Sequence, residues 1–125
     1  MLSSTCHCGV VRIDVPRKPR RLTSCNCSIC RRYGTLWAYY DHADVRIHAE
    51  PASTSGYSWG DRQLRFVRCN GCGCITHWEP LVLTARSRTG VNGRNFDPAQ
   101  LGDVRIRLLD GAATWKSSTD GVTWR

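Results

Sequence analysis

The segment Ser24-Cys25-Asn26-Cys27-Ser28-Ile29-Cys30-Arg31-Arg32 carries three cysteines within six residues, at Cys-x-Cys-x-x-Cys spacing. Thiolates are soft metal ligands, and three of them on one short segment are typical of a metal site. Two further clusters flank this segment, Cys6-His7-Cys8-Gly9 upstream and Cys69-Asn70-Gly71-Cys72-Gly73-Cys74 downstream, and the three clusters contain all eight cysteines of the chain. The remaining sequence is therefore interpreted as a scaffold that brings these clusters together.

The length of 125 residues suits one domain with a modest core. We expect a single zinc-binding domain over residues 1–125, with a tail from about residue 111 that is either loosely attached or a closing strand. The sequence has no apolar run typical of a signal peptide and no stretch near the roughly 18 apolar residues of a membrane span. These features predict a soluble, cytoplasmic protein without a membrane partner, in which cysteines bind metal rather than form disulfides.

The formal charge of +8 suggests a nucleic-acid binder at first sight. Zinc-bound cysteines are thiolates, however, so seven negative charges and two Zn²⁺ ions would reduce the net charge to about +5. The basic segment 17–21 has no interleaved aromatic residues and is interpreted as a solvated loop. Nucleic acid is therefore an unlikely partner, and an acidic small molecule suits the charge equally well.

Short segments with alternating, β-branched or aromatic residues predict strands, and no long amphipathic helix is evident. The predicted strands are 11–15, 35–40, 45–48, 57–59, 64–68, 74–78, 81–85 and 104–109. A hairpin turn is expected at 60–62, and Asp97 followed by Pro98 predicts one helical turn. The fold class is thus all-β. The aromatic residues Trp37, Tyr39 and Tyr40 either form core or wall a pocket.

The first and third clusters together supply a closed four-sulfur site. Neighbouring sulfurs of a tetrahedral zinc site lie roughly 3.8 Å apart, which a Cys-x-Cys pair in a strand or a Cys-x-x-Cys pair in a turn can span. The predicted ligands of this structural zinc are Cys6, Cys8, Cys69 and Cys72. Such a site would connect segments about sixty residues apart, and its binding energy would be part of the folding energy.

The central cluster supplies only three ligands, Cys25, Cys27 and Cys30, and an open fourth position is typical of catalytic zinc. We therefore expect a second, catalytic zinc here. The alternative is a structural site closed by a distant ligand, for which the residues considered are Cys74, His7, His42, His48 and His77. Cys74 is the strongest of these because it shares a strand face with Cys72, although it could equally be a small buried hydrophobic residue.

The order and spacing of these three clusters, over residues 3 to about 85, resemble the motifs of the glutathione-dependent formaldehyde-activating enzyme family, which includes centromere protein V. The resemblance implies a tent-like zinc-binding fold of short antiparallel strands joined by cysteine knuckles. It also implies a structural zinc on the outer pairs and a catalytic zinc on the central three cysteines. Carbon-sulfur lyase chemistry on a thiol-aldehyde adduct such as S-hydroxymethylglutathione follows from the same resemblance.

By the same resemblance, Arg31 is placed to attract a carboxylate or alkoxide, while a surface arginine is an equally good interpretation. A zinc with three thiolates carries a net charge of −1 and generates hydroxide poorly, so thiol chemistry is favoured over hydrolysis. The expected partners are a small-molecule thiol and an aldehyde. A non-enzymatic zinc-binding module for protein interaction is the competing hypothesis, and an accessible central zinc would separate the two.

Overall fold

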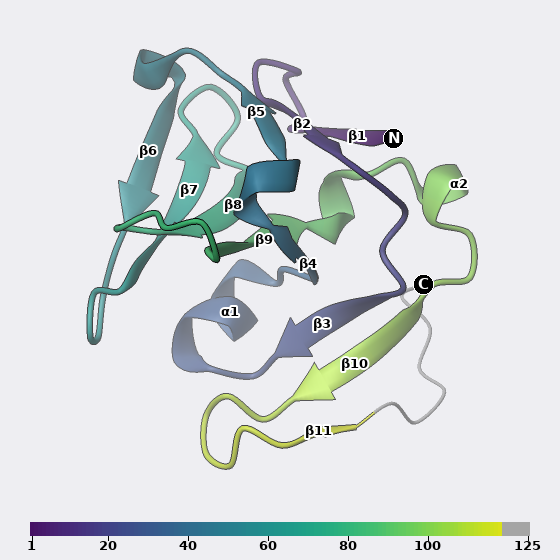
Figure 1. Cartoon of the computed structure of the whole chain (residues 1–125), viewed down its shortest axis with the longest axis vertical. Coiled ribbons are helices and arrows are strands. Elements are labelled where there is room, and N and C mark those ends of the chain that lie inside the picture. The colour runs from purple at the N-terminus through teal and green to yellow at the C-terminus, as the bar shows by residue number, and fades with distance from the viewer. Residues whose placement is uncertain (119–125) are drawn as a thin grey trace.

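The computed structural model describes residues 1–118, and most of the regular structure in this range is β-sheet (Figure 1). The strands are β1 (Leu2–Thr5), β2 (Arg12–Val15), β3 (Arg21–Cys25), β4 (Trp37–Asp41), β5 (Arg46–His48), β6 (Thr54–Tyr57), β7 (Leu64–Cys69), β8 (Ile75–Pro80), β9 (Arg88–Asn92), β10 (Arg105–Leu109) and β11 (Ser117–Ser118). The short helices are α1 (Ser28–Tyr33) and α2 (Pro98–Leu101), with 3-10 turns at His42–Asp44, Pro51–Ser53 and Gly93–Asn95. The prediction of an all-β fold is confirmed.

The strands form two sheets. A three-stranded sheet has the order β1-β2-β5, and an eight-stranded sheet has the order β11-β10-β3-β4-β9-β8-β7-β6. The pairs are antiparallel except for β3 and β10, which run parallel from Arg21 opposite Arg105 to Cys25 opposite Leu109. This parallel pair, followed by β11, forms the lower part of the view in Figure 1. Strands β10 and β11 are therefore built into the large sheet beside the strand that ends at Cys25.

Two hairpin turns carry the outer cysteines. The turn between β1 and β2 is closed by the Gly9 N–H, which donates to the Cys6 carbonyl over 3.0 Å. The turn between β7 and β8 is closed in a similar way by Gly73 and the Cys69 carbonyl, at 2.8 Å. Both glycines have a positive φ, at 83° and 76°, a conformation that costs residues with a Cβ more. The cysteine knuckles that the family resemblance implies are thus present at both turns.

Alternation along β4 divides the core into two parts. Ala38 and Tyr40 point to a large core that joins the three-stranded sheet and α2 to one face of the large sheet. Trp37 and Tyr39 point to the opposite face, where they pack with the central cysteines. The sequence left open whether Trp37, Tyr39 and Tyr40 form core or wall a pocket. Tyr40 lies in the large core, whereas Trp37 and Tyr39 lie on the opposite face beside the central cysteines, because side chains alternate between the two faces of a strand.

The predicted strands 11–15, 35–40, 45–48, 64–68, 74–78 and 104–109 match β2, β4, β5, β7, β8 and β10 with small shifts at their ends. The turn at 60–62 connects β6 and β7, and the Asp97 side chain caps α2 by accepting from the Ala99 N–H. For 57–59 only Tyr57 is in a strand, because β6 begins earlier, at Thr54.

The strand predicted at 81–85 is wrong. Leu81, Val82 and Leu83 lie in an exposed turn segment, and the strand of this region is β9. Strand β9 is a central strand between β4 and β8, and its Gly90 lies directly under the Trp78 ring, where a Cβ would overlap the indole. The position of a strand inside a sheet, rather than its own hydrophobicity, therefore decides which segment is extended.

Residues 111–118, the described part of the predicted tail, are attached to the large sheet. After a turn over residues 110–116, β11 pairs with β10, with Leu108 opposite Ser118 and Leu109 opposite Ser117. A closing strand is thus present at this point, and the rest of the predicted tail, residues 119–125, lies outside the described residues.

No helix among the described residues combines the length and the apolar character needed to cross a membrane.

Candidate functional site

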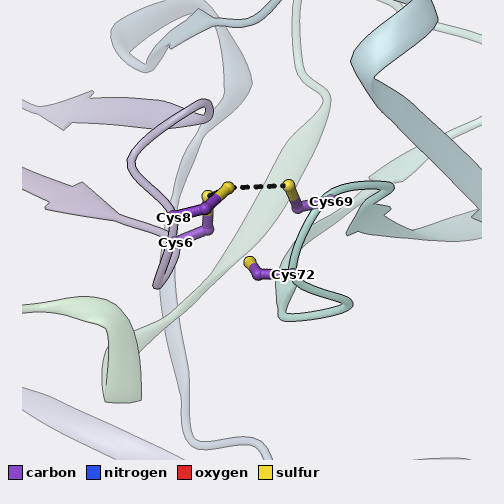
Figure 2. Close-up of side chains that lie close together, drawn as sticks. All are labelled: Cys6, Cys8, Cys69 and Cys72. Carbon is purple, nitrogen blue, oxygen red and sulfur yellow. Dashed lines mark hydrogen bonds between the residues drawn. The ribbon is translucent and has the colours of Figure 1, made fainter.

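The outer cluster brings together two cysteines from each hairpin turn. The Sγ atoms of Cys6, Cys8, Cys69 and Cys72 all lie within 4.8 Å of one another (Figure 2). The Sγ atoms of Cys6 and Cys8 are 3.7 Å apart, and those of Cys8 and Cys69 are 3.5 Å apart. These distances are close to the sulfur-sulfur spacing of a tetrahedral zinc site, about 3.8 Å. The predicted four-sulfur group is therefore assembled with spacing that fits a metal ion.

Backbone N–H groups surround the outer sulfurs. Val11 donates to the Cys6 Sγ and Gly71 to the Cys69 Sγ, each over 3.3 Å. The N–H of Cys74 lowers the pKa of the Cys72 thiol to about 5, together with the N–H of Cys8 and neighbouring thiols. Hydrogen bonds of this kind favour the thiolate, which is the form that binds a metal. The chemistry of the ligand set thus also fits zinc.

The central cluster is built by the transition from β3 to α1. Cys25 is the last residue of β3, Cys27 is the N-cap of α1, and Cys30 lies in its first turn. The Cys27 Sγ accepts from the Cys30 N–H over 3.4 Å, so the helix start aims this sulfur back along the helix. The three Sγ atoms lie within 4.8 Å of one another. The sequence predicted a loop here, and it missed the short helix that arranges the ligands.

Burial raises the pKa of the Cys25 and Cys30 thiols. Burial acts in the same direction on Cys27, but the N–H of Cys30 and the adjacent thiols lower its pKa overall. The indole Nε1 of Trp37 donates to the Cys30 Sγ over 3.4 Å and supports negative charge on that sulfur. Burial and mutual repulsion oppose the presence of three thiolates side by side. A cation bound between the sulfurs would remove this cost, so the group fits a metal site.

Within residues 1–118, no fourth His, Cys, Asp or Glu side chain joins the three central sulfurs. Cys74 lies at the outer hairpin, beside the Cys72 thiol and the backbone of His7. The imidazoles of His42 and His77 face Glu79, and that of His48 hydrogen-bonds to Asp14 over 2.8 Å. Cys74, His42, His48 and His77 thus have other neighbours, His7 belongs to the outer cysteine cluster, and within residues 1–118 the central group consists of three sulfurs.

Arg31 follows Cys30 on α1, but its side chain is exposed and is not among the residues that line the pocket at the central cysteines. Arg32 is exposed as well and donates to the Ser28 carbonyl over 2.7 Å, across one helical turn. Both arginines thus occupy the last turn of a short helix, where positive charge is favourable. Any action of Arg31 on a pocket ligand would be through its charge.

The loop after β10 holds the central cluster in position. Asn26, between two of the cysteines, donates from Nδ2 to the Asp110 Oδ1 over 2.9 Å and accepts from the Ala112 N–H over 3.0 Å. Its own N–H donates to the Leu109 carbonyl. Gly111 comes so close that an added Cβ would lie 2.5 Å from the Cys25 Sγ. The sequence reasoning overlooked this segment, although Gly111 and Trp115 were visible in a tail of otherwise polar residues.

A pocket of about 480 Å³ opens at the central sulfurs. Cysteines and apolar side chains make up most of its wall. Its lining residues are Cys25, Cys27, Ile29, Cys30, Trp37, Tyr39, Trp59, Gly60, Asp61, Gln63, Leu64, Phe66, Trp78, Leu109, Gly111 and Trp115. The volume lies in the range of small-molecule sites, 300–1,000 Å³. The sequence signal that was available for this wall is the abundance of tryptophan, five in the chain.

The basic segment 17–21 lines a separate groove of about 380 Å³, together with Tyr39, Tyr40 and Arg88. The Arg17 guanidinium lies over the Tyr40 ring at 5.8 Å, and the Tyr40 hydroxyl donates to the Arg17 carbonyl. Tyr40 itself is only 2% exposed, so its ring offers no free face on which a base could stack. The groove is distinct from the pocket at the central cysteines.

The all-β architecture thus carries a four-sulfur group and, at a pocket, a three-sulfur group, and both groups could hold a metal ion. The sequence pattern of the glutathione-dependent formaldehyde-activating enzyme family matches residues 1–100, and the chain belongs to this family. No curated protein matches the chain. A crystal structure of a Rhodobacter sphaeroides protein is similar, with a TM-score of 0.67 and 29% identity over 84% of this chain and 99% of that one.

Proposed function

We propose that the protein is a zinc-dependent carbon-sulfur lyase that acts on a thiol-aldehyde adduct, such as S-hydroxymethylglutathione, at the central cysteines. The family supports a glutathione-related, formaldehyde-activating function, and the two cysteine groups are consistent with two metal sites. The observation that carries the proposal is the group of three sulfurs on the wall of a pocket, with no fourth protein ligand within residues 1–118. An open position at a pocket is what a catalytic metal needs.

The residues assigned to the central metal are Cys25, Cys27 and Cys30, and those assigned to the structural metal are Cys6, Cys8, Cys69 and Cys72. Zn²⁺ bound in the central group would supply a Lewis acid that lowers the pKa of a nearby thiol. Trp37 and the N–H of Cys30 stabilise the charge of the ligand sulfurs by hydrogen bonds, and Asn26 holds their loop against Asp110. Arg31 contributes positive charge at the edge of the site.

In the cleavage direction, the bond between sulfur and the hydroxymethyl carbon breaks, and its electron pair stays on sulfur. The hydroxyl oxygen loses its proton to water at the pocket mouth and becomes the carbonyl oxygen of formaldehyde. The products are one thiolate, one aldehyde and one proton, and addition is the reverse of these changes. The apolar wall of the pocket favours this chemistry because few water molecules compete with the thiol for the reacting carbon.

The proposal is tested by Cys27→Ser. We expect the metal content to fall from two ions per chain to one. The acceleration of adduct formation from formaldehyde and thiols over the uncatalysed reaction, followed by NMR, should be lost. The circular dichroism spectrum should be retained because the outer group is unchanged. Cys74→Ser is the matched control and should keep both ions and full activity. Retention of activity in Cys27→Ser would contradict the proposal.

The competing function is a zinc module that binds other proteins and catalyses nothing. It is compatible with the outer group, which has a structural arrangement, but it assigns no role to a pocket at the central sulfurs. A central metal with four protein ligands and no spectral or kinetic response to thiols would favour this second function.

A further inference from the structure

The pocket at the central cysteines has an unusual distribution of charge for a site that binds glutathione. Six aromatic side chains contribute to its wall: Trp37, Tyr39, Trp59, Phe66, Trp78 and Trp115. Apart from the cysteines, Asp61 is the only charged residue among the lining residues in the described part of the chain, and it is acidic. Within residues 1–118, no lysine or arginine lines this wall, although the whole chain contains 18 of them.

Glutathione carries two carboxylates and one ammonium group, and carboxylates are usually recognised by arginine or lysine. Three thiolates with one Zn²⁺ would carry a charge of −1, and Asp61 adds another negative charge near the mouth. Three arginines lie near the pocket without lining it: Arg31 at the edge of the site, Arg65, and Arg107, whose guanidinium lies over the Tyr39 ring at 5.7 Å. Arg65 forms an ion pair with Glu79 at 2.7 Å, and Arg107 donates to the Thr23 hydroxyl over 3.2 Å. The pocket thus offers little to stabilise an anionic thiol substituent.

Two tryptophans of the wall remain exposed. Trp59 is 41% exposed and Trp115 is 69% exposed, which leaves large apolar surfaces in contact with water. Their backbones are nevertheless fixed. The Trp115 N–H donates to the Asp110 carbonyl over 2.7 Å, and the Trp59 carbonyl accepts from the Arg62 N–H over 3.0 Å. Exposed aromatic rings at a pocket are favourable contacts for an apolar ligand, because binding removes apolar surface of both partners from water.

We propose that the central site selects thiols with an uncharged aromatic substituent over glutathione, and that Trp59 and Trp115 are specificity-determining residues for that substituent. The inference rests on the proposed lyase chemistry and changes its substrate: the preferred adduct carries an aromatic thiol in place of glutathione. The bond changes are those given above, with the aromatic group attached to the sulfur that leaves. Trp115 lies beyond residue 100, where the match to the family ends, so part of the wall that selects the substrate comes from a segment outside that match.

The test is isothermal titration calorimetry of the zinc-loaded full chain with benzyl mercaptan, glutathione and 2-mercaptoethanol. We expect benzyl mercaptan to bind about tenfold or more tightly than 2-mercaptoethanol, because the ring buries apolar surface against the tryptophans. Glutathione should bind no more tightly than 2-mercaptoethanol, and Asp61→Asn should improve the binding of glutathione without changing that of benzyl mercaptan. Tighter binding of glutathione than of benzyl mercaptan to the wild-type protein would overturn the inference.

Trp59→Ala and Trp115→Ala should each weaken benzyl mercaptan several-fold and leave 2-mercaptoethanol unchanged. Tyr57→Ala is the matched control, because Tyr57 is an aromatic residue that is 45% exposed and does not line the pocket. Circular dichroism will establish that each variant is folded. Unchanged affinity for benzyl mercaptan in both tryptophan variants would overturn the assignment of these residues.

A cobalt-substituted protein separates this inference from the proposed function. If thiols reach the central metal, benzyl mercaptan changes the sulfur-to-cobalt absorption and benzyl alcohol does not. Equal binding of the two compounds without a spectral change would overturn the proposed lyase function and support the aromatic preference. A spectral change with glutathione that exceeds the change with benzyl mercaptan at equal concentration would support the function and overturn the preference.

Discussion

At the scale of single residues, the space beside the Cys25 sulfur depends on the missing side chain of Gly111. Gly111 approaches Cys25 so closely that even a methyl group would force the sulfur to move, since its Cβ would lie 2.5 Å from the Sγ. Near the outer group, a Cβ on Gly71 would lie 3.4 Å from the Cys8 Sγ, an ordinary contact distance. Both glycines thus lie beside a cysteine sulfur, but only Gly71 has room for a methyl group.

We predict that Gly111→Ala lowers the affinity of the central metal site about tenfold or more, because the displaced sulfur can no longer complete the three-sulfur group. Titration of the metal-free protein with zinc and a chromophoric competitor will measure this affinity. Gly71→Ala is the matched control and should leave both sites intact. An unchanged central affinity in Gly111→Ala would contradict the close packing of this residue against the sulfur.

Glu79 is a second residue whose environment decides its chemistry. His77 at 3.6 Å, Arg65 at 2.7 Å and His42 at 3.3 Å surround its carboxylate. His77, followed by Arg65, lowers the pKa of this carboxyl to about 2 against the effect of burial. A lowered pKa in the folded state means that the carboxylate stabilises the fold above the pKa of the unfolded chain, about 4.3.

We predict that Glu79→Gln lowers the free energy of unfolding by up to about 3 kcal/mol at pH 7. The difference from wild type should shrink as the pH falls from about 4.3 towards 2, because protonation removes the same charge from the wild-type protein. Urea unfolding at several pH values will measure this difference, and both proteins lose bound metal alike in acid. The exposed Glu50→Gln is the control. A difference that stays constant over this pH range would contradict the assigned ion pairs.

At the level of elements, the turns of the two hairpins β1–β2 and β7–β8 present four sulfurs to one another. The Sγ atoms of Cys8 and Cys69 lie 3.5 Å apart although 61 positions separate them in the chain. A metal at this point would hold the three-stranded sheet to the end of the large sheet. Its binding energy would therefore be part of the folding energy.

We predict that Cys69→Ser leaves the protein unfolded or insoluble. The binding free energy of a structural zinc is about as large as the 5–15 kcal/mol by which domains are usually stable, so its loss would remove most of the stability. Cys6→Ser should have the same effect, whereas Cys27→Ser should stay folded. Solubility, circular dichroism and thermal melting with and without a chelator will test this. A soluble Cys69→Ser protein with native melting would contradict a structural role of the outer group.

For the whole molecule, the formal charge is +8, yet no lysine or arginine within residues 1–118 lines the candidate active site. The basic groove of residues 17–21 and Arg88 lies elsewhere, and its Tyr40 ring is buried. Binding of nucleic acid through this groove would depend on phosphate contacts alone, which weaken steeply with salt. The other aromatic ring of the groove, Tyr39, already carries the Arg107 guanidinium at 5.7 Å, so the groove mainly supplies electrostatic attraction.

We predict that the protein binds duplex DNA weakly at physiological salt and that binding falls further as salt is raised. Fluorescence anisotropy with a labelled duplex, for the wild type and for Arg20→Ala with Arg21→Ala, will measure this. Tight binding at physiological salt that is lost in the double variant would contradict the prediction and make nucleic acid a partner.

The sequence by itself determined the all-β class and the division of seven cysteines into two groups, because the ligand spacing of Cys-x-Cys and Cys-x-x-Cys pairs is a local property. Local spacing says nothing about which distant side chains share a wall. Only the tertiary structure placed Cys74 at the outer hairpin, directed Arg31 away from the pocket wall and brought Trp115 to the central sulfurs. It also selected β9 in place of residues 81–85, because burial between two neighbouring strands outweighs the hydrophobicity of a short segment.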